Sequence, residues 1–63
     1  MMVSPELSAG RIVYHLMQGD TLRDRAWVMF ERIAAFARAG NPYAIRVRRG
    51  IANIARKLQA RSY

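Results

Sequence analysis

The C-terminal segment NPYAIRVRRGIANIARKLQAR (residues 41–61) holds six of the chain's eleven Lys and Arg residues and no acidic residue. Across the whole chain, arginine outnumbers lysine ten to one. A guanidinium group is planar and always charged, and it binds phosphate or carboxylate through two parallel hydrogen bonds. The chemistry that this segment could perform is therefore the binding of an anion.

The charge of the chain is distributed unevenly. Residues 1–39 carry five Arg against four acids, whereas residues 40–63 carry six basic residues against none. These balances of +1 and +6 make up the formal net charge of +7. A field of one sign attracts polyanions and accelerates their encounter. We therefore expect the C-terminal part to contact nucleic acid or an acidic protein surface, with a membrane as the less favoured partner.

The residue types that catalysis needs are sparse. His15 is the only histidine, and its neighbours one helical turn away are Arg11 and Gly19, so no local carboxylate orients it. Asp20 and Asp24 are better explained as helix-start residues. The chain has no cysteine and no glycine-rich phosphate loop, and a chain this short has difficulty enclosing a pocket of about 300 Å³. We predict that the protein is not an enzyme and uses no metal, cofactor or small-molecule substrate.

Apolar residues in the middle of the chain could bind a partner protein. Trp27 is the only tryptophan and lies at the rim of an apolar stripe. There it would either cover the core against the first helix, which we favour, or anchor an interface. Val28, Ala35 and Ala39 form a shallow apolar strip on the far side, where small residues permit close approach of another helix. The candidate protein-interface residues are therefore Trp27, Val28, Ala35 and Ala39.

Three segments combine helical periodicity with helical punctuation, and none shows the two-residue alternation of a strand. The predicted helices cover residues 5–18, 21–39 and 42–60. The first and third begin with the same pattern, a capping residue followed by proline: Ser4 with Pro5, and Asn41 with Pro42. Gly19 suits the left-handed residue that ends many helices. We therefore expect the first and third helices to have well-defined starts.

The middle helix has a less distinct start. We expect Asp20 or Thr21 to cap it, and Asp24, three residues after Thr21, to complete a weaker form of the capping box. The helix is predicted to end near Ala39, before Gly40.

Each predicted helix has one apolar face. The expected core positions are Ala9, Ile12, Val13, Leu16 and Met17 in the first helix, Leu22, Ala26, Met29, Phe30, Ile33, Phe36 and Ala37 in the second, and Ala44, Val47, Ile51, Ile54 and Leu58 in the third. The last five residues, which we call the apolar seam, follow steps of three and four. Such steps are typical of a coiled coil, although here they extend over only two heptads.

The basic residues of the third helix lie opposite the apolar seam. At about 100° per residue, one arc of about 140° contains the residues that we call the basic arc: Arg46, Arg49, Arg56, Lys57 and Arg61. Arg48 lies apart, nearer the edge of the seam. Gly50 and Asn53 fall within the arc, and the glycine would allow close approach of phosphates or of another helix. The predicted contact surface consists of Arg46, Arg49, Gly50, Asn53, Arg56, Lys57 and Arg61.

Sixty-three residues allow a single domain, spanning residues 1–63. A chain of this length hides only about 60% of the surface that its unfolded form exposes, and it has no cysteine for a disulfide. Close helix packing or a second chain must supply the remaining stability. Short links between long helices favour antiparallel neighbours. We therefore expect an all-α fold, either a three-helix bundle or a homodimer of helical hairpins, with self-association favoured.

The sequence has neither a signal-peptide pattern nor an apolar segment that could cross a bilayer. Its longest apolar runs, AWVMF and IAAFA, have five residues each, against about 20 for a membrane span. On this basis we expect a cytoplasmic protein for which a membrane is the less favoured partner.

These observations predict a small binding protein, a regulator or accessory factor that contacts nucleic acid. The link AGNP joins two helices of about 18 residues, longer than the leading helix of a helix-turn-helix motif, so we expect contact with the backbone rather than base readout. The alternative is an inhibitor or adaptor that docks on an acidic surface of a larger enzyme or complex. Phage-encoded modulators of host enzymes are often of this size. The basic arc is also compatible with the solvated face of an ordinary helix.

Overall fold

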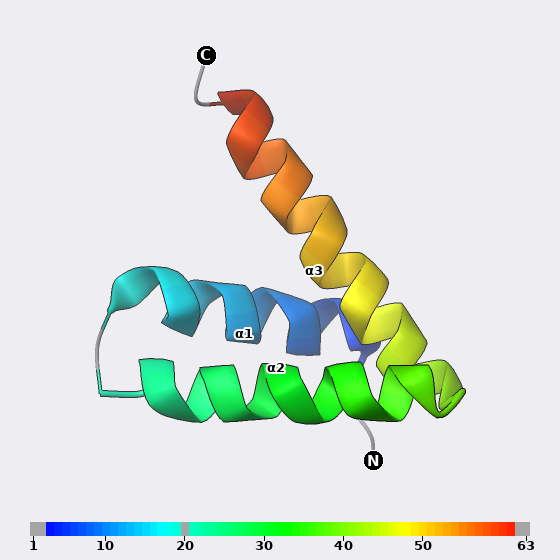
Figure 1. Cartoon of the computed structure of the whole chain (residues 1–63). Helices are drawn as coiled ribbons and strands as arrows, with labels where there is room; N and C mark the ends of the chain where they lie inside the picture. The colour runs from blue at the N-terminus through cyan, green and yellow to red at the C-terminus, as the bar shows by residue number, and fades with distance from the viewer. Residues whose placement is uncertain (1–2, 20, 62–63) are drawn as a thin grey trace.

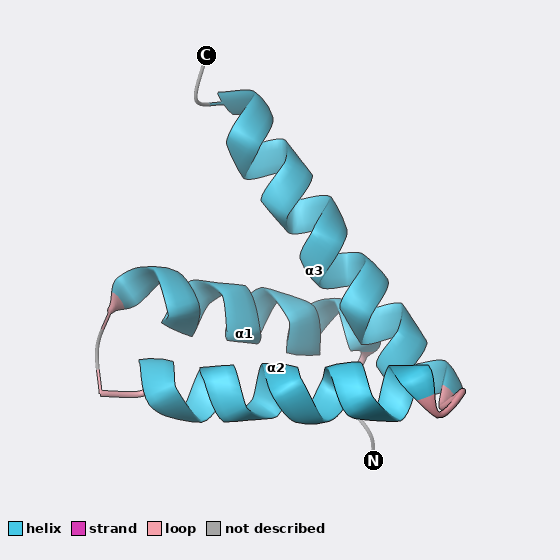
Figure 2. Cartoon of the chain, in the orientation of Figure 1, coloured by secondary structure: helices cyan, strands magenta, loops and turns pink. Residues whose placement is uncertain are grey.

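The computed structural model describes residues 3–19 and 21–61. Within them it contains three helices, α1 (Pro5–Gln18), α2 (Arg23–Arg38) and α3 (Pro42–Arg61), and no strand (Figure 2). The predicted all-α fold of three helices is therefore confirmed. α1 and α2 form an antiparallel hairpin; α3 crosses one end of it, and the C-terminal half of α3 rises away from the hairpin (Figure 1).

Both predicted cap-and-proline starts are confirmed. The Ser4 hydroxyl accepts a hydrogen bond of 3.2 Å from the Leu7 backbone N–H. The Asn41 side-chain carbonyl accepts one of 3.0 Å from the Ala44 N–H. Each bond satisfies a backbone donor that has no partner within the helix. Gly19 ends α1 with a left-handed φ of 66°, as predicted.

The start of α2 differs from the prediction. The helix begins at Arg23, and Leu22 occupies the cap position without any side-chain capping bond. The expected capping box is therefore wrong, because Thr21 precedes the cap position, and Asp20 lies outside the described residues. Asp24 still lies in the first turn of α2, where the helix dipole favours a negative charge.

The turn between α2 and α3 reverses the chain through a Schellman motif. α2 ends at Arg38, one residue before the predicted end. The Gly40 N–H donates to the carbonyl of Ala37 at 3.0 Å, and the Asn41 N–H donates to that of Phe36 at 3.0 Å. Gly40 has a φ of 92°, which favours a residue without a Cβ. Asn41 thus closes α2 through its backbone and caps α3 through its side chain.

The core lies where α3 crosses the hairpin. Its centre consists of Ala9 and Ile12 of α1 and Val47 of α3, all buried. The partly buried side chains packed around this centre are Leu16, Phe30, Ile33, Tyr43, Ile51 and Ile54. The other buried residues, Ala26, Ala37 and Ala44, are small, so the helices approach one another closely.

Some of the predicted core positions are exposed instead: Met17, Leu22, Met29 and Phe36. Periodicity identifies the apolar face of each helix correctly, but it does not determine how much of that face is covered. Because α3 crosses the hairpin at one end (Figure 1), it leaves part of the apolar surface of α1 and α2 open to solvent.

Candidate functional site

The basic arc faces solvent along the whole of α3. Its exposed side chains are Arg46, Arg49, Arg56, Lys57 and Arg61. The buried residues of α3, Ala44 and Val47, lie outside this arc. α3 has no acidic residue, and no arc side chain forms an ion pair within residues 3–19 and 21–61. These charges are therefore free to attract a polyanion.

Asn53 lies among the arginines of the arc, as the helical wheel predicts. Its side-chain carbonyl accepts a hydrogen bond of 3.4 Å from a guanidinium nitrogen of Arg56. The bond is long and exposed, so it stabilises the fold little. It holds the Arg56 guanidinium over the arc, where a ligand phosphate could replace the amide as its partner.

Gly50 faces α1 rather than open solvent. A Cβ at this position would lie 2.8 Å from the Cβ of Ala9, which is too close for two carbon atoms. Of the two roles that the sequence suggests for this glycine, close approach of another helix is the one observed. Gly50 is half-buried, and its place in the contact surface stays a prediction.

Arg48 was not among the predicted contact residues, because the helical wheel places it outside the basic arc. It lines a shallow hollow together with Arg49 of the arc and Ala37 of α2. The two arginines thus border the same depression where α3 meets α2. No pattern within α3 indicates this proximity, because it depends on the position of α2.

The candidate protein-interface residues of α2 are all exposed: Trp27, Val28, Ala35 and Ala39. The Trp27 side chain is 53% exposed, and its ring stacks on that of Phe30 with centroids 5.7 Å apart. Phe30 in turn packs against the centre of the core, so Trp27 lies at the edge of the core with about half of its side chain exposed. Val28 is 49% exposed, so the apolar strip is open to contact.

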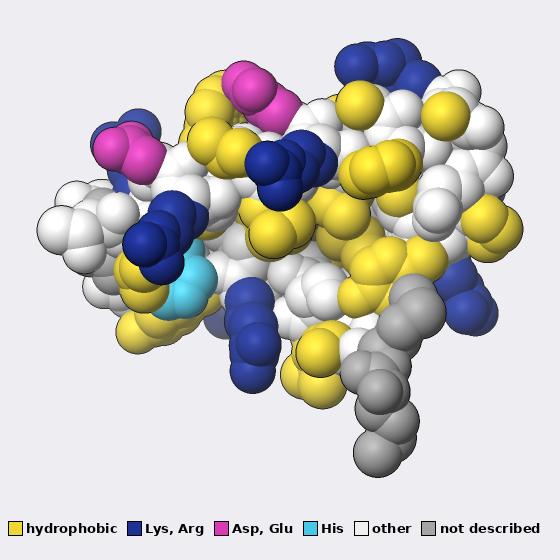
Figure 3. Space-filling model, turned by 90° about the horizontal axis from the view of Figure 1, so that it is seen from below, with side chains coloured by type: hydrophobic (Ala, Val, Ile, Leu, Met, Phe, Trp, Pro, Cys, Tyr) yellow, Lys and Arg dark blue, Asp and Glu magenta, His cyan; other side chains and the backbone are white. Residues whose placement is uncertain are grey.

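A hollow of about 350 Å³ lies between α1 and α2. Hydrophobic side chains gather on this face, with Lys or Arg and the histidine around them (Figure 3). The hollow is widely open to solvent, so it is a surface depression and not an enclosed pocket. The hollow is lined by Ser8, Arg11, Ile12, His15, Leu22, Arg25, Ala26, Met29, Ile33 and Tyr43, with no carboxylate among them.

The hydroxyl groups at this hollow hydrogen-bond to each other. Tyr43 OH donates to the carbonyl of Val3 at 2.8 Å, so in the 2.6 Å bond between Tyr43 and Ser8 the serine is the donor. A serine nucleophile needs a base as the acceptor of its proton. The Tyr43 hydroxyl donates its own proton to a carbonyl and is not such a base. The hydrogen bond between Ser8 and Tyr43 instead connects α1 to α3.

Among residues 3–19 and 21–61, no three His, Asp, Glu or Cys side chains are grouped in a way that could hold a metal ion. No helix formed by these residues is long and apolar enough to traverse a bilayer.

Comparisons of the chain with family models, curated proteins and solved structures give no match. The function is therefore inferred from the surfaces described above. Among them, the basic arc is the one whose charged side chains all have the same sign.

Proposed function

We propose that this chain is a non-enzymatic nucleic-acid-binding protein, a small cytoplasmic regulator or accessory factor that holds the phosphate backbone with the basic arc of α3. The observation that carries the proposal is the arc itself. Its five cations are exposed and have no acid on the same helix. A solvated face needs charge for solubility, but it does not need charge of only one sign.

The shape of α3 supports contact with a duplex. A helix of 20 residues is about 30 Å long and 10–12 Å wide, and the major groove of B-DNA is about 12 Å wide. The C-terminal half of α3, with Arg56, Lys57 and Arg61, rises clear of the hairpin (Figure 1). It could therefore approach a groove or a single strand without interference from α1 and α2. We propose phosphate contact, since cations of this kind hold a backbone of any sequence.

The proposal is tested by fluorescence anisotropy with labelled double-stranded DNA, single-stranded DNA and RNA over a series of salt concentrations. If three to five arc residues reach phosphates of a duplex, log K should fall against log salt with a slope of about −3 to −4.5. Charge reversal at Arg49 and Arg56, as R49E/R56E, should weaken binding at least about tenfold and make the slope shallower by about 2.

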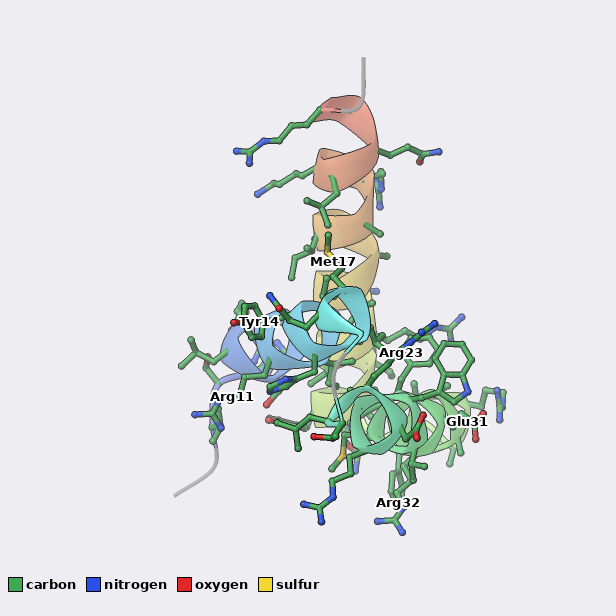
Figure 4. All side chains as sticks on the ribbon, turned by 90° about the vertical axis from the view of Figure 1, so that its left-hand side faces the viewer. Arg11, Tyr14, Met17, Arg23, Glu31 and Arg32 are labelled. Carbon is green, nitrogen blue, oxygen red and sulfur yellow. The ribbon has the colours of Figure 1, made fainter. Side chains whose placement is uncertain are left out.

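A matched control distinguishes the effect of losing arc residues from the effect of a lower net charge. Arg11 of α1 and Arg32 of α2 are exposed and point away from the rising half of α3 (Figure 4). The variant R11E/R32E changes the net charge as much as R49E/R56E does, and it should keep most of the affinity. Equal losses in both variants would contradict the proposal, as would an absence of binding at low salt.

A second candidate function is docking on an acidic surface of a larger protein, as an inhibitor or adaptor. The exposed Trp27 and Val28 on α2 support it, because an apolar anchor at an interface contributes affinity that charge alone does not. The apolar strip belongs to α2 and the basic arc to α3. V28E therefore tests the strip without altering the residues of the arc. If V28E keeps the affinity for nucleic acid but abolishes the biological function, the docking role is favoured.

A further inference from the structure

The hollow between α1 and α2 has an apolar lining. Of the residues that line it, Ile12 and Ala26 are buried and Ile33 is partly buried, whereas Met29 is 47% exposed. The hollow has a volume of about 350 Å³ and is open to solvent, and hydrophobic side chains gather on this face of the molecule (Figure 3). Apolar surface that remains in contact with water favours burial by a partner.

The ionised groups at the hollow are cationic. Arg11 of α1 and Arg25 of α2 line it, one from each helix, and both are exposed. Neither arginine forms an ion pair with another described residue. No acid among the described residues lines the hollow. A partner that fills the hollow therefore gains most if it has an apolar centre with negative charge on both sides.

The length of the hollow matches a few turns of a helix. Its lining extends from Ser8 to His15 along α1 and from Leu22 to Ile33 along the start and middle of α2. At 1.5 Å per residue, these stretches are about 10 Å and about 16 Å long, or two to three helical turns. α1 and α2 are antiparallel (Figure 1), and bundles pack a further helix beside such a pair.

We propose that this hollow binds an amphipathic helix of a partner protein. Apolar side chains of that helix, spaced three, four and seven residues apart, enter the hollow, and acidic side chains on its two flanks contact Arg11 and Arg25. A helix satisfies its own backbone hydrogen bonds. An extended segment would need the edge of a sheet for that purpose, and the described residues form no strand.

Other occupants fit the hollow less well. The backbone of a nucleic acid is charged and would leave the apolar lining in contact with water. A second copy of the chain carries a net charge of +7, so Arg11 and Arg25 would repel it. A small molecule normally buries about 70–90% of its surface in its site, and a hollow this open does not enclose a ligand to that extent.

The binding of a partner helix does not rest on the proposed nucleic-acid binding. The hollow belongs mainly to α1 and α2, whereas the basic arc belongs to α3, so one molecule has separate surfaces for a partner helix and for a nucleic acid. The hollow also differs from the apolar strip, because Val28, Ala35 and Ala39 do not line it. With both surfaces occupied, the chain would link another protein to a nucleic acid, as an adaptor does.

The experiment measures the binding of labelled synthetic peptides to the full chain, without nucleic acid, by fluorescence anisotropy at physiological salt. The probe is a helix of about 18 residues, or five turns, with leucine on one face and glutamate on both flanks of that face. The control peptide has the same composition, with the leucines distributed around the helix. The probe should bind at least about tenfold more tightly than the control. Equal affinities would overturn the proposal, because charge alone would then explain the binding.

Two methionine variants locate the contact. Met29 lines the hollow, and Met17 of α1 does not, although it is 65% exposed. M29E and M17E make the same substitution and the same change in net charge. M29E should weaken the binding of the probe at least about tenfold, because it places a carboxylate against the apolar face of the peptide, and M17E should weaken it much less. Equal losses in the two variants would overturn the proposed site.

Two double variants test the arginines of the hollow. R11Q/R25Q and R23Q/R38Q each remove two positive charges from the hairpin, but Arg23 and Arg38 do not line the hollow. Arg11 and Arg23 project from different sides of the hairpin (Figure 4). R11Q/R25Q should weaken the binding of the probe about fivefold, as expected for the loss of two exposed ion pairs, and R23Q/R38Q should change it little. Equal effects would contradict the proposed contact with the acidic flanks.

NMR spectroscopy of the isotope-labelled parent chain provides a second measurement if M29E loses helical content. Addition of the probe should shift the amide resonances of residues that line the hollow, such as Ile12, Ala26 and Ile33, more than those of residues 52–61 in α3. Shifts concentrated in residues 52–61 would overturn the proposal, because the peptide would then bind the basic arc through charge.

Discussion

At the position of Gly50, the lack of a side chain brings two helices together. The Cβ of Ala9, a fully buried residue, occupies the space that a side chain at position 50 would need. Gly10 of α1 is also a helical glycine, but a Cβ there would meet nothing within 4 Å. The two glycines therefore differ only in their tertiary surroundings, and the same substitution at each separates the packing contribution from helix propensity.

We predict that G50A destabilises the protein and that G10A stabilises it. Both gain helix propensity, about 1 kcal/mol, but alanine at position 50 must also displace α1, and overpacking of this kind costs about 1–3 kcal/mol. Thermal unfolding followed by circular dichroism, at one chain concentration, should show a lower Tm for G50A and a higher Tm for G10A. Equal increases would mean that α1 and α3 do not approach each other as closely as the structure indicates.

At the scale of the element, the turn between α2 and α3 sets the direction of the basic helix. The backbone bonds from Gly40 and Asn41 close α2, and the side chain of Asn41 then starts α3. The direction in which α3 leaves the hairpin depends on the left-handed conformation of Gly40, whose φ is 92°. A change at this residue therefore affects the packing of a whole helix.

We predict that G40A lowers the free energy of unfolding by about 1–2 kcal/mol, because an L-residue is strained in the left-handed region. Urea unfolding at a fixed chain concentration measures the change. Chemical synthesis of the chain permits a control with D-alanine at position 40, whose mirror-image chirality favours positive φ. The D-alanine form should retain the stability of the parent chain, and an equal loss in both forms would show that the cause is the added methyl group rather than φ.

For the whole molecule, the main feature is the separation of charged and apolar surfaces. The acids in the described residues are Glu6, Asp24 and Glu31 of α1 and α2, whereas α3 carries only cations. The apolar seam packs on the hairpin through Val47, Ile51 and Ile54. The exposed surface of α3 is therefore mainly cationic and is suited to a polyanion.

Self-association, which the short chain without cysteine favours, predicts that the thermal stability depends on chain concentration. A partner that binds only the folded state stabilises it by mass action, so the Tm should rise as the chain concentration rises. Differential scanning calorimetry over a broad range of concentrations measures this dependence. A constant Tm for the parent chain would argue against a dimer that contributes to stability.

The sequence by itself determined the features that depend on residues a few positions apart. The caps at Ser4 and Asn41 and the left-handed Gly19 follow from short-range hydrogen bonds and backbone sterics. The apolar faces and the basic arc follow from the helical repeat, which gives each side chain its angle about the axis. Where local signals were weak, at Thr21 and Asp24, the prediction of the helix start was wrong.

Only the tertiary structure decided what each face meets. The wheel shows Gly50 among arginines and Trp27 at the rim of a stripe, but only the packing of the helices places Gly50 against Ala9 of α1 and leaves about half of Trp27 exposed. The physical reason is that periodicity acts within one helix, whereas coverage depends on packing between residues far apart in the sequence, which no local pattern specifies.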